Sequence, residues 1–123
     1  MTIPPRLAQP HVLTILTGDE ERQISVSPEL MNDAGSLLQK MDQDMDQGSQ
    51  LSRRFIASPD RIERCQIVAN RLLTALHTQN EASAMLMAAY LLSRLSALKT
   101  AAINTEGEAE DTLFYDQNDS VIQ

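Results

Sequence analysis

The segment from Thr78 to Ala102 reads TQNEASAMLMAAYLLSRLSALKTAA, and an uninterrupted apolar run occupies its middle, Ala84–Leu92. Thr78 and Glu81 have the three-residue spacing of a capping box, in which the two residues satisfy free backbone N–H groups at a helix start. Leu95 and Leu98 extend the apolar pattern towards Ala102. A helix that is apolar on most sides must be covered by packed neighbours. The segment therefore predicts a central helix around which the rest of the chain is arranged.

The N-terminal part predicts a β-hairpin. Residues 1–10 contain three prolines and are expected to form a loose, extended leader. The next run, 11–17, is rich in β-branched residues, and 22–27 alternates polar and apolar side chains across a polar turn at 18–21. We therefore expect a hairpin at about 11–27. Because two strands alone are marginally stable, the hairpin must lie on a helix or pair with another chain.

Two further helices are expected between the hairpin and the central helix. Ser27-Pro28 and Ser58-Pro59-Asp60 both have the composition of helix starts. The first helix either continues through Gly48 to about residue 56 or breaks at Gly48, and the pattern leaves both possibilities open. The second runs to about His77 and pairs with the central helix in antiparallel fashion. The predicted fold class is mainly α, with an N-terminal hairpin followed by a three-helix antiparallel bundle in one domain, 1–104.

The C-terminal segment, 105–123, differs in character from the rest of the chain. Six acidic residues and no basic residue lie between 105 and 119, around the apolar stretch Leu113-Phe114-Tyr115. Such a composition buries too little apolar surface to order itself, so a flexible acidic tail is expected. An acidic and aromatic arm can bind a groove on a partner. The other possibility is that the tail covers its own body, as an extra strand on the hairpin or across the arginine-bearing helix face.

Composition limits the classes of partner. The formal net charge is −7, so nucleic acid and anionic membrane surfaces are not expected as partners. One cysteine cannot form an internal disulfide, and the N-terminus lacks the layout of a secretory signal. The longest apolar run is about half of the ~20 residues that a membrane-spanning helix needs. The expected location is the cytoplasm.

Candidate chemistry is sparse. Cys65 falls in an apolar stripe and predicts a buried, inert thiol, and His11 and His77 are isolated histidines with structural roles. The acidic stretch from Asp42 resembles the start of a calcium loop. However, an EF-hand needs glycine at its sixth place and glutamate at its twelfth, where this chain has Gln47 and Arg53. We therefore expect no catalytic residue, metal or cofactor, with a carboxylate-based enzyme kept as an alternative.

The sequence favours a non-enzymatic protein–protein interaction module, such as an adaptor, assembly factor or small chaperone. The central helix leaves apolar surface for self-association, which predicts a homodimer, and methionine-rich faces adapt to partners. An anion or an acidic segment is expected to dock on three arginines of the second helix, Arg61, Arg64 and Arg71. A regulatory module that binds a small molecule or anion between the helices is the alternative. The expected partner-binding residues are Met85, Leu86, Tyr90, Leu113, Phe114 and Tyr115.

Overall fold

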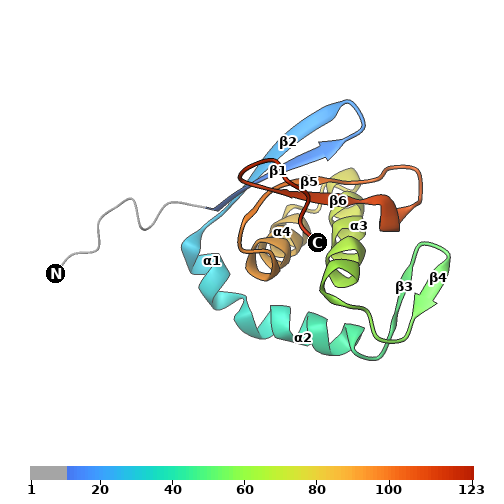
Figure 1. The fold of residues 1–123 in the computed structure, drawn as a ribbon. Coiled ribbons are helices and arrows are strands. Elements are labelled where there is room, and N and C mark those ends of the chain that lie inside the picture. Colours follow the sequence, from blue (N-terminus) through green and yellow to red (C-terminus); the bar gives the residue numbers. More distant parts are fainter. Residues whose placement is uncertain (1–10) are drawn as a thin grey trace.

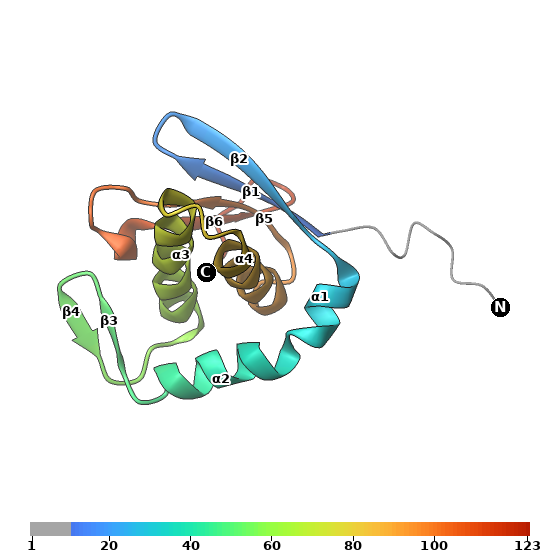
Figure 2. The ribbon, with the colours of Figure 1, turned by 180° about the vertical axis from the view of Figure 1, so that it is seen from behind.

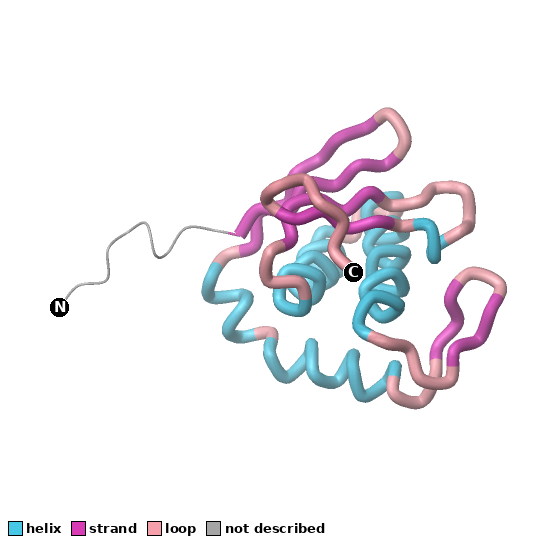
Figure 3. The backbone as a smooth tube through the Cα atoms, in the orientation of Figure 1, coloured by secondary structure: helices cyan, strands magenta, loops and turns pink. Residues whose placement is uncertain are grey.

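The computed structural model describes residues 11–123, so the leader expected at 1–10 lies outside the described residues. The described chain forms an α/β fold in which two helices pack on one face of a four-stranded sheet (Figures 1 and 3). The elements, in chain order, are β1 (His11–Thr17), β2 (Glu20–Val26), α1 (Pro28–Asp33), α2 (Gly35–Met45), β3 (Ser49–Leu51), β4 (Arg54–Ile56), α3 (Arg61–His77), α4 (Glu81–Arg94), β5 (Leu98–Ala102), the 3-10 turn η2 (Ala109–Asp111) and β6 (Leu113–Asp116).

The main sheet has the strand order β2-β1-β5-β6, and β3 and β4 form a separate two-stranded hairpin. β1 runs antiparallel to β2 and parallel to β5, while β5 and β6 are antiparallel. The predicted N-terminal hairpin is confirmed, but its turn comprises only residues 18–19. Gly18 has φ of 62°, and glycine at the first central position is typical of a type II′ hairpin turn.

The predicted fold class, mainly α with a three-helix bundle, is wrong. The helix expected over 78–102 begins at Glu81 and ends at Arg94, and Leu98–Ala102 forms strand β5 between β1 and β6. A short, apolar run gives the same signal for a buried strand as for a buried helix. Pairing decides the outcome, because β5 supplies the parallel neighbour of β1, with Thr100 opposite Thr14.

The start of α4 also differs from the expected capping box. Asn80 is the cap, and its Oδ1 accepts a hydrogen bond from the backbone N–H of Ser83. The hydroxyl of Thr78 instead donates to the carbonyl oxygen of Thr74, at the end of α3. A complete capping box lies at the start of α3, where Asp60 and Glu63 each accept the other's backbone N–H.

The first predicted helix is divided and ends before Gly48. α1 and α2 meet at Ala34, and α2 ends at Met45. Gly48 has φ of 94° and leads into β3. A Cβ atom at Gly48 would lie 2.3 Å from Cζ of Phe55, so the close approach of β4 requires glycine there. The break at Gly48 therefore comes from both backbone conformation and packing.

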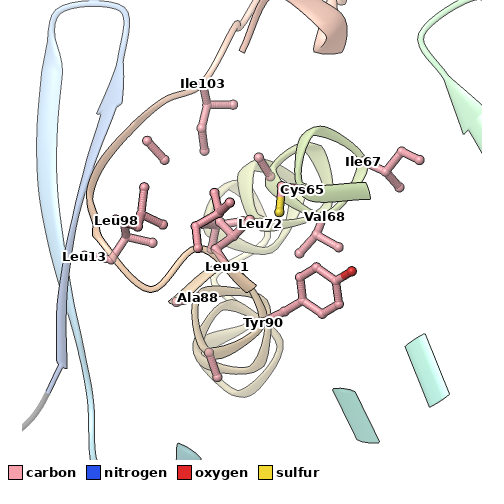
Figure 4. Close-up of a cluster of buried hydrophobic side chains, with 14 of the residues drawn as sticks. Leu13, Cys65, Ile67, Val68, Leu72, Ala88, Tyr90, Leu91, Leu98 and Ile103 are labelled. Carbon is pink, nitrogen blue, oxygen red and sulfur yellow. The ribbon is translucent and has the colours of Figure 1, made fainter. Parts of the chain in front are cut away.

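The core lies between the sheet and the paired helices α3 and α4, which stand side by side under the strands (Figure 2). Leu13 of β1 and Leu98 of β5 point towards Leu72 of α3 and Leu91 of α4 (Figure 4), and all four side chains are buried. This arrangement covers the apolar α4 from within its own chain.

The C-terminal segment belongs to the same folded body. β6 pairs with β5, and Phe114 is buried against the core with 1% of its surface exposed. The chain then turns back, so that Tyr115 bridges to Val121 and the N–H of Ile122 donates to the carbonyl oxygen of Phe114 at 2.8 Å. Residues 120–122 therefore form an intramolecular cover on the outer edge of β6.

Candidate functional site

The two edges of the main sheet differ in accessibility. The outer edge of β6 is bridged by the chain's own C-terminal residues, as described above. β2, at the opposite edge, is seven residues long and, within residues 11–123, is paired only with β1. An unpaired edge strand presents a row of free N–H and C=O groups to which another strand can bind. β2 is therefore the open edge of the main sheet.

The hairpin turn determines which groups of β2 face outward. Thr17 and Glu20 flank the two-residue turn and form a hydrogen-bonded pair, and pairs of this kind recur at every second residue of an antiparallel ladder. The backbone groups of Glu21, Gln23 and Ser25 consequently point away from β1. Over residues 11–123 these groups form no backbone hydrogen bond to another element. They are free to pair with an added strand.

A groove lies between β2 and the helix pair. Its largest hollow, of about 430 Å³, extends from Arg22 to the loop between α3 and α4. A second hollow, of about 280 Å³, lies beside Gln23, Ile24 and Ser25. Both hollows are lined by the same residues of α3 and α4, Leu76, Glu81 and Ala84. The groove therefore follows the open edge of β2.

The groove has an apolar floor beside Ile24 and a charged rim. Ile24, Leu76 and Met85 are half-buried members of the floor that pack against the core. On the rim, Arg22 lies 3.4 Å from the carboxylate of Glu20. Among the described residues, no ion pair involves Glu21 or Glu81, and both are exposed. An apolar floor beside an open strand edge can hold the side chains of an extended peptide.

A polar cluster, separate from the groove, ties α2 to the ends of α3 and α4. The Asp42 carboxylate accepts hydrogen bonds from the Tyr90 hydroxyl at 2.5 Å and from Nε and Nη2 of Arg94 at 2.9 and 2.7 Å. The guanidinium of Arg64 donates to Asp42 and also pairs with Asp46. The Arg94 guanidinium also stacks over the Tyr90 ring, 4.9 Å from its centre.

The electrostatics of this cluster are those of a structural tie. Partial burial opposes ionisation of Asp42, but hydrogen bonds from Tyr90, Arg94 and Arg64 and the charge of Arg94 outweigh burial, so the pKa of Asp42 is lowered. Burial and the bond to Asp42 raise the pKa of Tyr90. Because the charged groups satisfy one another, the cluster holds α2 in place and presents no free reactive group.

The expected partner-binding residues do not share one surface. Tyr90 and Phe114 are core residues with 1% of their surface exposed, so the fold keeps both from a partner. Met85 lines the groove, whereas Leu86 is half-buried elsewhere on α4. Leu113 and Tyr115 lie on β6 opposite Ala102 and Thr100, on the sheet face away from α3 and α4.

The three arginines expected to form an anion site are also separated. Arg61 donates to the carbonyl oxygen of Gln123 at 2.9 Å, and Arg64 is engaged by Asp42 and Asp46. Arg71 is exposed and lines a hollow of about 240 Å³ with Met87. No two of these arginines share a bonding partner among the described residues.

Sequence reasoning missed most of the groove. The alternation over 22–27 indicated a strand with one wet face, but no local signal shows which edge of a sheet remains open. That depends on the position of β5, whose residues the sequence pattern predicts to be helical. The residues missed include Arg22, Ile24, Leu76, Glu81 and Ala84.

Cys65, in contrast, is buried as expected, and burial raises the pKa of its thiol to about 12. Such a thiol carries almost no thiolate at neutral pH and is a poor nucleophile. Within 11–123, no helix combines the length and the hydropathy that crossing a bilayer requires.

Comparison with known proteins adds no further assignment. No protein-family model, curated protein or solved structure matches this chain significantly.

Proposed function

We propose that this protein is a non-enzymatic interaction module of the cytoplasm that binds an extended segment of another protein as an added strand on β2. The single observation that carries the proposal is that β2, whose outer edge is unpaired within residues 11–123, has a groove beside its residues 22–25. Strand addition derives affinity from main-chain hydrogen bonds and specificity from pockets for alternate side chains. β2 would supply the main-chain hydrogen bonds, and the groove would supply the pockets for side chains.

The two edges of the sheet support this choice of surface. Natural proteins cover or charge exposed sheet edges because bare edges aggregate. Here the C-terminal residues cover the β6 edge, whereas no segment between residues 11 and 123 covers the outer edge of β2. The charged residues at the start of β2, Glu20, Glu21 and Arg22, discourage indiscriminate pairing and leave the edge open to a complementary strand.

The reason for which the sequence predicts self-association does not apply to this fold. Because the sheet and α3 cover much of α4, a second copy is not needed to shield this helix. The homodimer remains a prediction, and a dimer formed through β2 would occupy the proposed site. Light scattering on purified protein measures this directly.

Selection from a displayed library of random peptides tests the proposed function, with binding of each enriched synthetic peptide measured by calorimetry. The informative variant is Gln23→Pro. Its missing N–H belongs to the outward row, so the ladder to β1 keeps its hydrogen bonds while the incoming strand loses one and meets the proline ring. Gln23→Ala is the matched control, because it removes the same side chain and retains the N–H.

The proposal requires that wild-type protein and Gln23→Ala bind the enriched peptides alike and that Gln23→Pro binds at least about ten-fold more weakly. Circular dichroism and thermal unfolding establish that both variants are folded. Equal binding by folded Gln23→Pro and wild-type protein would place the peptides elsewhere and refute strand addition at β2. Failure to enrich any peptide also counts against the proposal.

A further inference from the structure

Within the described residues, two carboxylates beside the open edge of β2 have no basic partner. Arg22 is offset by Glu20, whereas Glu21 and Glu81 have no ion-pair partner within residues 11–123. Glu81 lines both hollows of the groove. Asp19, in the hairpin turn, adds a further exposed carboxylate at the same end of β2.

The two free carboxylates lie on opposite sides of the open edge. Glu21 is opposite Leu16, which in turn is opposite Ala102, and this row lies on the sheet face away from the helices. Glu81 belongs to α4 and faces the groove beside Ile24. An added strand would therefore pass between carboxylates on both of its faces, with the apolar floor under its inward side chains.

The charge pattern argues against a second copy as the occupant. In antiparallel self-pairing only the outward residues of β2 can form hydrogen-bonded pairs with one another, and these are Glu21, Gln23 and Ser25. Glu21 would then face Glu21, Gln23 or Ser25 of the second copy. None of these registers places a basic residue opposite Glu21. The register that places Glu21 opposite Glu21 brings two carboxylates together.

We propose that the occupant is a basic, extended segment of another protein, with apolar side chains turned into the groove and Lys or Arg beside Glu21 and Glu81. This inference rests on the proposed function and specifies its partner. Opposite charges directly across two strands stabilise their pairing, and like charges oppose it. The net charge of −7 also favours encounter with a cationic partner.

Two synthetic peptides test the inference by calorimetry against the full chain. The basic probe is acetyl-Thr-Lys-Val-Arg-Val-Lys-Lys-Thr-amide, which in an extended strand has basic side chains on one face and Val-Val-Lys on the other. The acidic probe carries Glu in place of each Lys and Arg. Glu21→Lys is the test variant. Glu106→Lys is its control, because it makes the same charge change at an exposed loop position away from β2.

We expect the basic probe to bind wild-type protein and Glu106→Lys about ten-fold more tightly than the acidic probe does. Glu21→Lys should lose this preference or reverse it, and Gln23→Pro should abolish binding of both probes. Added salt, to roughly 0.5 M, should weaken the basic probe because the carboxylates are exposed.

The other possible outcomes overturn different parts of the proposal. Equal binding of both probes, lost in Gln23→Pro, overturns the charge inference and leaves strand addition standing. Binding of the basic probe that persists in Gln23→Pro overturns the proposed function as well. A wild-type dimer that Gln23→Pro converts to monomer assigns the edge to a second copy and overturns the inferred partner.

Discussion

Asp42 on α2 and Arg94 at the end of α4 are 52 residues apart in sequence, and two nitrogen atoms of the Arg94 guanidinium donate to one carboxylate oxygen of Asp42. The same carboxylate accepts the hydroxyl of the buried Tyr90. This single acidic side chain thus fastens a peripheral helix to the core pair.

Replacing Asp42 by alanine should destabilise the fold by about 2 kcal/mol, because the Tyr90 hydroxyl and two arginines lose their acceptor in a partly buried site. Urea unfolding measures the change. Asp44→Ala is the control, since Asp44 pairs with Lys40 on the surface at 3.7 Å, and its loss should stay below about 0.5 kcal/mol. Equal effects of the two substitutions would contradict the structural role of Asp42.

The lowered pKa of Asp42 predicts a pH dependence of stability. A carboxyl group whose pKa is depressed by folding stabilises the native state above its ordinary value, 3.8 here, and this contribution is lost as pH falls through the depressed folded value. Wild-type stability should therefore fall below about pH 4 more steeply than that of Asp42→Asn. Urea midpoints measured at a series of pH values compare the two slopes. Parallel slopes would show that Asp42 does not titrate differently in the folded state.

Adjacent residues of β6 should respond very differently to truncation. Phe114 is buried in the core, and Phe114→Ala should cost about 3 kcal/mol of unfolding free energy. Leu113 is 42% exposed on the other face, and Leu113→Ala should cost less than about 1 kcal/mol. Thermal and urea unfolding provide the comparison. A small effect of Phe114→Ala would mean that the C-terminal segment is not part of the folded sheet.

Two glycines should also respond oppositely to alanine. Gly18 has φ of 62° in the hairpin turn, where a Cβ atom is strained, so Gly18→Ala should destabilise by about 1 kcal/mol. Gly35 begins α2 and has open space around it, so Gly35→Ala should be neutral or stabilise by up to about 1 kcal/mol. Unfolding midpoints of the two single variants test the turn assignment. A neutral Gly18→Ala would argue against the II′ turn.

Local patterns in the sequence predicted the hairpin, the start of α3 and the buried Cys65, because strand alternation, capping residues and apolar stripes act over short distances. The strand identity of Leu98–Ala102 could not be read locally. Its apolar residues satisfy a helix or a buried strand equally, and only pairing with β1 and β6 selects the strand. The error in fold class follows from this one segment.

The candidate site was hidden for the same reason. Met85 was singled out for its apolar character and does line the groove, but Ile24 and Leu76 join it only after the chain folds. The distance in sequence between β2 and α4 leaves no spacing rule to connect them. The open edge is a property of strand order, which the incorrect helix assignment had concealed.

Amide hydrogen exchange of β2, followed by NMR with and without a bound peptide, tests strand addition most directly. Free protein should exchange quickly at Glu21, Gln23 and Ser25 and slowly at Arg22 and Ile24, whose N–H groups pair with β1. Bound peptide should slow exchange at the three outward amides. Tight peptide binding that leaves those three amides in fast exchange would contradict the proposal.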